Sequence, residues 1–279
     1  MHRIRLTLSH LYATVFIVYL IAPLLVMAGA AFNDSKLPSI VPWKGWTTRW
    51  FAEMAADDRM MLAFVNTLWV AAAVAILSVI VGTASAILIN SISGRVRTMI
   101  YGLMISTILI PGIVIGISTM LLWTKVGNTL DTDFFLFGAG LHLSVLGQVS
   151  YIAAMVMLLV LARLQSFDTG LEEAALDLGA SHAQVMRRIL LPHLYPAIGA
   201  GAAVAFFQSI ENYNVTQFTR GGADTLTVYV FSKVRSGITP TINALAVIMI
   251  SVTILAAILY ELRRRRQERL MAAMAPPEE

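Results

Sequence analysis

The residues best suited to chemistry lie in two places, and neither has the composition of a catalytic centre. One is a polar run in which Glu211 supplies a carboxylate, Asn212 an amide and Tyr213 a phenol. A carboxylate beside neutral hydrogen-bonding groups suits the binding of a cationic or zwitterionic solute. The other is an alanine-rich stretch that carries Glu172 and Glu173. A short acidic helix of this kind suits contact with a protein groove.

Several kinds of catalytic or cofactor site are absent from the sequence. The chain has no cysteine, so it can form neither a disulfide framework nor a thiolate metal site. It lacks the Gly-x-x-x-x-Gly-Lys-Ser/Thr run of a nucleotide-binding loop, and Gly221-Gly222 is better interpreted as a turn. It has no Gly-x-Ser-x-Gly elbow, His-rich cluster or paired carboxylates in its apolar segments. We therefore expect a non-catalytic chain with no metal and no cofactor of its own.

The composition excludes an ordinary soluble protein. Of the 279 residues, 58% are hydrophobic and only 13% are charged, whereas a soluble domain is about 25% charged. The net charge of +4 is too small, and too interrupted by apolar sequence, to indicate nucleic-acid binding.

Six long windows contain no Asp, Glu, Lys or Arg, and each reaches the roughly 20 residues that a helix needs to cross a bilayer. A β-barrel would instead show alternating polar and apolar residues. The first window is an anchor rather than a signal peptide, because its apolar run is longer than a signal core. The sequence predicts an all-α membrane protein, a single transmembrane domain over 1–279. Its six helices are expected at 11–32, 62–90, 99–123, 142–163, 193–214 and 240–261, followed by a tail at 262–279.

Positive charges predict the orientation. The short loop with Arg95 and Arg97 and the tail with Arg263–Arg266 carry an excess of arginine, which favours the cytoplasmic side. Both termini are therefore expected in the cytoplasm. The outer segment 34–59 is rich in tryptophan and predicts an ordered lid at the membrane interface.

Polar residues near the spans are candidates for a solute path. Glu211 lies roughly 27 Å along the fifth span at about 1.5 Å per residue, which places it with Asn212 and Tyr213 at the outer end. The cluster either contacts the solute or simply meets water there. Asn66 in the second span either faces the path or makes hydrogen bonds between helices. Pro111 in the third span indicates a kink.

Between the fourth and fifth spans the sequence predicts a helix-turn-helix hairpin at 169–191. Thr169 with Glu172 and Ser181 with Gln184 each fit a capping box, and Gly179 fits a left-handed turn between the two helices. One helix face carries small and apolar residues, which favours docking into a protein over lying on the bilayer. These residues are Leu171, Ala174, Ala175 and Leu178.

The hairpin also carries a recognisable motif. Glu173-Ala-Ala, then Gly179 and then Ile189-x-Leu-Pro192 match the EAA motif at every specified position. The chain thus resembles the permease subunits, with a MetI-like fold, of binding-protein-dependent ABC importers. The closing stretch 225–245 is similar to the second permease of the spermidine/putrescine branch.

The resemblance implies a function and a set of partners. The hairpin is expected to be a cytoplasmic coupling helix that docks on one of two ATP-binding subunits, which would hold the ATP and Mg. A second permease, membrane lipid and an extracytoplasmic binding protein are the other expected partners, at the cell inner membrane. The coupling residues implied in this way are Glu172, Glu173, Ala174, Ala175, Gly179 and Arg187.

The expected cargo is a small amine or amino-acid-like solute, such as a polyamine. Polyamine permeases commonly carry two adjacent Asp where this chain has Glu211-Asn212, which suits a solute with fewer positive charges. An ion-coupled secondary carrier or channel is the alternative. Such a carrier would usually show internal repeats and an ionisable pair at mid-membrane, which are not visible here.

Overall fold

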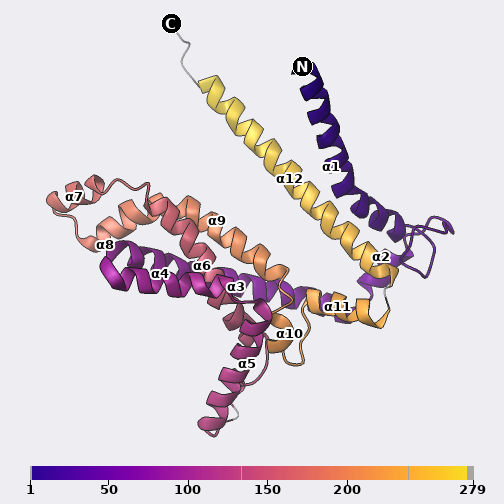
Figure 1. The fold of residues 1–279 in the computed structure, drawn as a ribbon, viewed down its shortest axis with the longest axis horizontal. Coiled ribbons are helices and arrows are strands. Elements are labelled where there is room, and N and C mark those ends of the chain that lie inside the picture. Colours follow the sequence, from indigo (N-terminus) through magenta and orange to yellow (C-terminus); the bar gives the residue numbers. More distant parts are fainter. Residues whose placement is uncertain (1, 133, 238, 275–279) are drawn as a thin grey trace. The chain divides into compact units, whose positions relative to one another are not determined.

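The computed structural model describes residues 2–132, 134–237 and 239–274 of the chain (Figure 1). Within these ranges the chain is helical and forms no β-strand, only an isolated bridge between Asn33 and Trp46. The chain divides into two compact units. Unit 1 comprises residues 1–58 and 232–279, and unit 2 comprises residues 59–231.

Unit 1 is built on two long helices, α1 (His2–Ala31) and α12 (Pro240–Met274). α12 packs against α1 and against the short helix α2 (Arg49–Ala55). A loop of residues 32–48 joins α1 to α2 and is closed by Trp50, whose indole Nε1 donates to the carbonyl of Asn33 at 2.9 Å.

Unit 2 is organised around α6 (Leu141–Leu164), which packs against α9 (Leu191–Ile210) and α4 (Gly94–Leu109). Its other long helices are α3 (Asp58–Ser91) and α5 (Gly112–Thr129). The core consists of aliphatic side chains from α3, α6 and α9. They include Val70, Val74, Ile152, Val156, Met157, Val160 and Leu194.

The short elements of unit 2 lie in the connections. α7 (Gly170–Asp177) and α8 (His182–Val185) connect α6 to α9, and a π-helical segment, Met186–Leu190, joins α8 to α9. α10 (Thr216–Thr219) follows α9, and α11 (Leu226–Ser236) begins in unit 2 and ends in unit 1. A single 3-10 turn, Phe135–Phe137, precedes α6.

Five helical segments of the described chain are long and apolar enough to cross a membrane. α4 and α5 are together also long and apolar enough to cross a membrane, and they make a sixth span if they form one broken span. The sequence-based prediction of a helical membrane protein with about six spans is confirmed at this level.

The predicted third span, 99–123, is not a continuous helix. α4 ends at Leu109 and α5 begins at Gly112, and the two are bent by 108°. Ile110 has an extended backbone because the ring of Pro111 disfavours helical geometry in the residue before it. The kink predicted at Pro111 is thus a complete break.

The last helix is longer than the span predicted for it. α12 continues beyond 261 to Met274 and includes most of the predicted tail, 262–279. Residues 275–279 of that tail lie outside the described residues.

Glycines allow α6 to lie close to its neighbours. A Cβ placed on Gly82 of α3 would come within 2.6 Å of the Ala153 carbonyl oxygen and 2.9 Å of the Met157 amide nitrogen. A Cβ on Gly201 of α9 would come within 2.9 Å of a Val156 methyl group. Small residues at helix contacts of this kind are typical of membrane proteins, where close backbone packing replaces the hydrophobic effect.

We expect Gly82→Ala to lower the free energy of unfolding by about 1–3 kcal/mol, because the added methyl meets backbone atoms that cannot rotate away. Thermal unfolding of the purified chain in detergent measures this. Gly199→Ala is the matched control, since a Cβ there has no atom within 4 Å. Equal stabilities of the two variants would contradict the packing argument.

Candidate functional site

The hairpin between α6 and α9 turns at Gly179. This residue has φ +84°, a left-handed backbone that favours glycine. The Ala180 amide donates to the Ala175 carbonyl at 3.0 Å and the Gly179 amide donates to the Leu176 carbonyl at 2.9 Å. This pair of bonds is the Schellman arrangement that closes a helix C-terminus. The predicted left-handed turn is confirmed.

One of the two predicted capping boxes forms. The Ser181 hydroxyl accepts from the Gln184 amide at 3.3 Å, and the Gln184 side-chain oxygen accepts from the Ser181 amide at 2.7 Å. The box at Thr169 and Glu172 is wrong, because Thr169 has helical backbone angles and makes no side-chain cap. Asp168 takes its place, with its carboxylate accepting from the Gly170 amide at 2.9 Å.

The first helix of the hairpin shows its apolar face to the outside. Leu171 is 54% exposed and Leu178 is 89% exposed, whereas Glu172 and Ala175 are half-buried. Glu173, Ala174 and Arg187 are exposed. Beside the turn lies a surface pocket of about 270 Å³. Its lining residues are Leu178, Gly179, Ala180, Gln184, Val185, Arg188 and Ile189.

The base of the hairpin is tied together by the ends of the two long helices. The guanidinium Nε of Arg163 donates to the His193 carbonyl at 3.1 Å, and the His193 ring lies 3.3 Å from the Arg163 carbonyl oxygen. The rings of Phe167 and His193 pack edge to face with centroids 5.2 Å apart. These contacts join the end of α6 to the start of α9, so both ends of the hairpin are fixed to each other.

The second candidate region is the polar run that follows α9. Glu211 lies at the C-terminal end of this helix and its side chain is exposed. Asn212 is buried, and its amide nitrogen donates to the Tyr151 hydroxyl at 2.6 Å. Its side-chain oxygen accepts from the backbone amide of Val215 at 3.1 Å. Asn212 thus fixes the chain where α10 begins.

A row of buried hydrogen bonds fastens this segment to α6. The Ser209 hydroxyl donates to the Gln148 side-chain oxygen at 2.6 Å, and the Gln148 amide nitrogen donates to the Thr216 hydroxyl at 2.9 Å. The hydroxyls of Ser144 and Thr219 share a further bond at 2.9 Å. Ser144, Gln148 and Tyr151 follow helical spacing, so one face of α6 holds the whole segment.

Val215 lies in a socket lined by glycines. A Cβ on Gly116 of α5 would come within 2.9 Å of the Val215 carbonyl oxygen, and one on Gly147 of α6 within 2.8 Å of a Val215 methyl group. A Cβ on Gly112 would come within 3.0 Å of Asn214. The break at Pro111 therefore brings the start of α5 against the segment that contains Glu211.

Tyr213 packs against an aromatic residue of α11. Its ring lies 4.3 Å from that of Phe231, centroid to centroid, at an interplanar angle of 40°. Tyr213 is half-buried and Phe231 is exposed. The Glu211 carboxylate and the Tyr213 ring two residues later, which packs on Phe231, are groups that attract ammonium ions.

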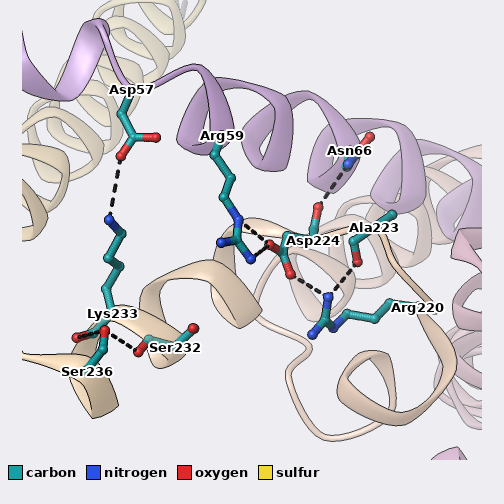
Figure 2. A network of polar contacts seen from close by, with 9 residues as sticks. All are labelled: Asp57, Arg59, Asn66, Arg220, Ala223, Asp224, Ser232, Lys233 and Ser236. Carbon is teal, nitrogen blue, oxygen red and sulfur yellow. Dashed lines mark hydrogen bonds and ion pairs between the residues drawn. The ribbon is translucent and has the colours of Figure 1, made fainter.

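Asn66 lies in a polar network that the sequence did not reveal (Figure 2). Its amide nitrogen donates to the backbone carbonyl of Asp224 at 2.9 Å. The Asp224 carboxylate accepts two bonds from Arg59, from Nε at 2.8 Å and from Nη2 at 2.6 Å. Arg220 binds the other carboxylate oxygen and the carbonyl of Ala223. Arg59 and Asp224 are far apart in sequence, so spacing carries no signal of their pairing.

The segment 224–227 links the two sets of candidate residues in unit 2. The Thr67 hydroxyl accepts from the Leu226 amide at 2.7 Å, and the Thr227 hydroxyl donates to the Asn212 carbonyl at 3.2 Å. Asn66 is thus joined to Asn212 through this segment, and it bonds to a connecting loop rather than to another long helix. No group of three or more metal-binding side chains occurs in the part of the chain that the structure describes.

Comparison with known proteins identifies the class. Residues 77–271 match the family model described as the binding-protein-dependent transport system inner membrane component. The putrescine transport system permease protein PotI of Escherichia coli K12 is 36% identical over 83% of this chain and 82% of its own length. The spermidine/putrescine permease PotC of Haemophilus influenzae is 29% identical over 94% and 98% of the two chains.

Solved structures share the fold. A bacterial alginate ABC transporter, in complex with an alginate pentasaccharide-bound periplasmic protein, superposes with a TM-score of 0.72 at 17% identity, over 93% of each chain. An amino acid ABC transporter with histidines gives a TM-score of 0.53 at 21% identity, over 79% of this chain and 99% of that one.

The fold and the family match define an ABC importer permease, a transport component and not an ion-coupled carrier or channel. The chain belongs to the family of inner membrane components of binding-protein-dependent transport systems, and it is homologous to the polyamine permeases PotI and PotC.

A double-mutant cycle tests the buried hydrogen bonds. We expect Gln148→Leu to lower the free energy of unfolding by about 1–3 kcal/mol, because it leaves the Ser209 and Thr216 hydroxyls without this partner. Ser209→Ala should then cost less in the Gln148→Leu background than alone, with a coupling on the order of 0.6–1.7 kcal/mol. Denaturant unfolding in detergent measures both, with Gln208→Leu as control. If the effects of the two substitutions on the free energy of unfolding were strictly additive, the hydrogen bond between Gln148 and Ser209 would be contradicted.

Proposed function

We propose that this chain is the permease subunit that couples ATP hydrolysis, on separate ATP-binding subunits, to the import of a small amine. The hairpin at 169–191 is the coupling element. The observation that carries this proposal is the exposed apolar face of α7 on a rigid, anchored hairpin within a chain of the importer family. Leu178, 89% exposed at the turn, is a contact that a protein groove would bury.

The orientation follows from charge. Arg163 precedes the hairpin and Arg187 and Arg188 lie within it, and arginine is enriched on the cytoplasmic side of membrane proteins. This places the hairpin, the loop with Arg95 and Arg97, and both termini in the cytoplasm. The two compact units then act as one transmembrane domain of the inner membrane over 1–279.

The coupling residues have distinct roles. Glu172 and Glu173 contact basic residues of the ATP-binding subunit, and Ala174 and Ala175 allow its surface to come close. Gly179 sets the direction of the second helix. The π-helical segment with Arg187 continues directly into α9. A displacement of the hairpin by the ATP-binding subunit therefore also displaces α9.

The remaining components are partner chains. ATP and Mg bind to two ATP-binding subunits, and a second, homologous permease completes the translocation path. An extracytoplasmic binding protein delivers the solute. The alginate transporter of the same fold is in complex with a periplasmic protein that carries an alginate pentasaccharide, which supports this assembly.

The solute is a small amine or amino-acid-like compound, such as a polyamine. Two relatives are named as putrescine and spermidine/putrescine permeases. In this chain Glu211 is exposed at the end of α9 and offers the carboxylate. Tyr213 offers an aromatic surface, and Asn212 holds both residues in position through Tyr151. Asn66 on α3 contributes to the solute path by holding the loop at Asp224 in place through its hydrogen bond to the Asp224 carbonyl.

Gly179→Val should uncouple ATP hydrolysis from transport. A β-branched residue in the left-handed region costs on the order of 1–3 kcal/mol, so the turn should open. We expect uptake per ATP to fall about tenfold in the reconstituted importer, since ~1.4 kcal/mol corresponds to a factor of ten. Gly222→Val is the control, because that glycine has open space and no positive φ. If the Gly179→Val variant transported as much solute per ATP as the unmodified chain, the coupling role of the hairpin would be contradicted.

Glu211→Gln should weaken uptake of a cationic solute by up to about fivefold, because an exposed ion pair contributes about 0.2–1 kcal/mol. Initial uptake rates into vesicles measure the effect, and Glu211→Asp should restore most of it. Glu53→Gln, an exposed carboxylate on α2, is the control.

Competition with putrescine, spermidine and amino-acid derivatives identifies the solute class. Transport of only a phosphate or sulfate ester would refute the proposed cargo, while the coupling role of the hairpin would stand.

A further inference from the structure

The loop between α1 and α2 buries two polar side chains and exposes several large apolar ones. Asn33 and Ser35 are buried at 0% and 2% exposure. Large apolar side chains are exposed instead, at 64% for Leu37, 73% for Val41 and 79% for Trp46. A cluster of exposed large apolar side chains is unfavourable in a loop that is surrounded by water.

Hydrogen bonds to Asn33 make this loop rigid. The Asn33 amide nitrogen donates to the carbonyls of Ser39 at 2.8 Å and Pro42 at 3.0 Å. Its side-chain oxygen accepts from the Lys44 amide at 2.8 Å. One buried side chain thus binds three points of the loop, and the exposed apolar residues are displayed on a fixed surface.

The loop folds back onto the end of α1. The Asp34 amide donates to the Gly45 carbonyl at 2.8 Å, and the Thr47 amide donates to the Phe32 carbonyl at 2.9 Å. The Trp46 ring lies 5.9 Å from that of Phe32, centroid to centroid. Trp46 is therefore at the level where α1 ends, within a residue or two of its last turn.

α1, which leads into this loop, has an exposed apolar surface. Within its membrane-length segment, Ser9–Ala31, Ala30 and Ala31 at the end are buried, whereas the leucine, valine and isoleucine side chains are exposed. Such a surface requires an apolar environment, which the hydrocarbon of a bilayer provides. The aromatic cluster of Phe32, Trp43 and Trp46 continues that apolar surface beyond the end of the helix.

We propose that the loop 34–48 is seated in the phospholipid headgroup layer of the leaflet in which α1 ends, with Trp43 and Trp46 as its anchors. Tryptophan prefers this layer because its ring is apolar and its indole nitrogen is a donor. Lys36 and Lys44 are exposed on the same loop and suit lipid phosphates. The ligand is the membrane surface itself, and the loop fixes the depth of α1.

The absence of cysteine allows a direct test. Val41→Cys and Trp46→Cys are labelled with a nitroxide in the full-length chain, assembled with cysteine-free partner subunits. The complex is placed in phosphatidylcholine/phosphatidylglycerol vesicles. Accessibility to oxygen, which partitions into lipid, is compared with accessibility to a water-soluble nickel chelate. Glu53→Cys on α2 is the control, since this exposed carboxylate position should face water.

We expect oxygen to relax the labels at 41 and 46 more than the nickel chelate does, and the reverse at 53. Greater nickel accessibility at 41 and 46 would overturn the proposal, because the loop would then lie in water. Loss of accessibility to both reagents would also overturn it, because a protein partner would then cover the loop.

Since Trp46→Cys removes a proposed anchor, Val41→Cys alone decides the matter if the other variant does not assemble. Asn33→Ala provides a further check in the Val41→Cys background. It should release the loop and abolish the preference for oxygen at that position.

Discussion

The hydrogen bonding of α6 to the segment after α9 is the interaction on which unit 2 depends. Gln148 is fully buried and uses its side-chain oxygen for Ser209 and its nitrogen for Thr216. In an apolar environment such groups cannot turn to water, so the segment has no equally good alternative position. The glycines around Val215 reinforce this, because they let the chain approach to van der Waals contact.

α9 joins the two regions that the proposed function needs. Its N-terminal end continues from the hairpin through the π-helical segment, and its C-terminal end carries Glu211. The helix has 20 residues, a length of about 30 Å at roughly 1.5 Å per residue. A movement at one end is therefore passed to the other along a single helix. Arg163 and Phe167 hold the first end on α6, and Asn212 and Ser209 hold the second.

Much of the fold could be predicted because membrane helices are specified by composition. The charge-free windows predicted α1, α3, α6, α9 and α12 to within a few residues at most of their ends, although α1 and α12 extend further. The turn at Gly179 and the cap at Ser181 were predictable because both are local arrangements of neighbouring residues. The cap at Thr169 failed for a local reason too, since Asp168 competes for the same position.

What the sequence determined by itself is the membrane class, the approximate spans and the hairpin with its motif, because hydropathy and turn chemistry act over short distances. Tertiary structure decided what the polar residues do. Asn212 turned out to be committed to Tyr151, and Asn66 to the loop at Asp224, which Arg59 and Arg220 hold. Only folding brings Asn212 to Tyr151, and Asn66 and Arg59 to Asp224, because no spacing along the chain encodes a contact between residues that distant.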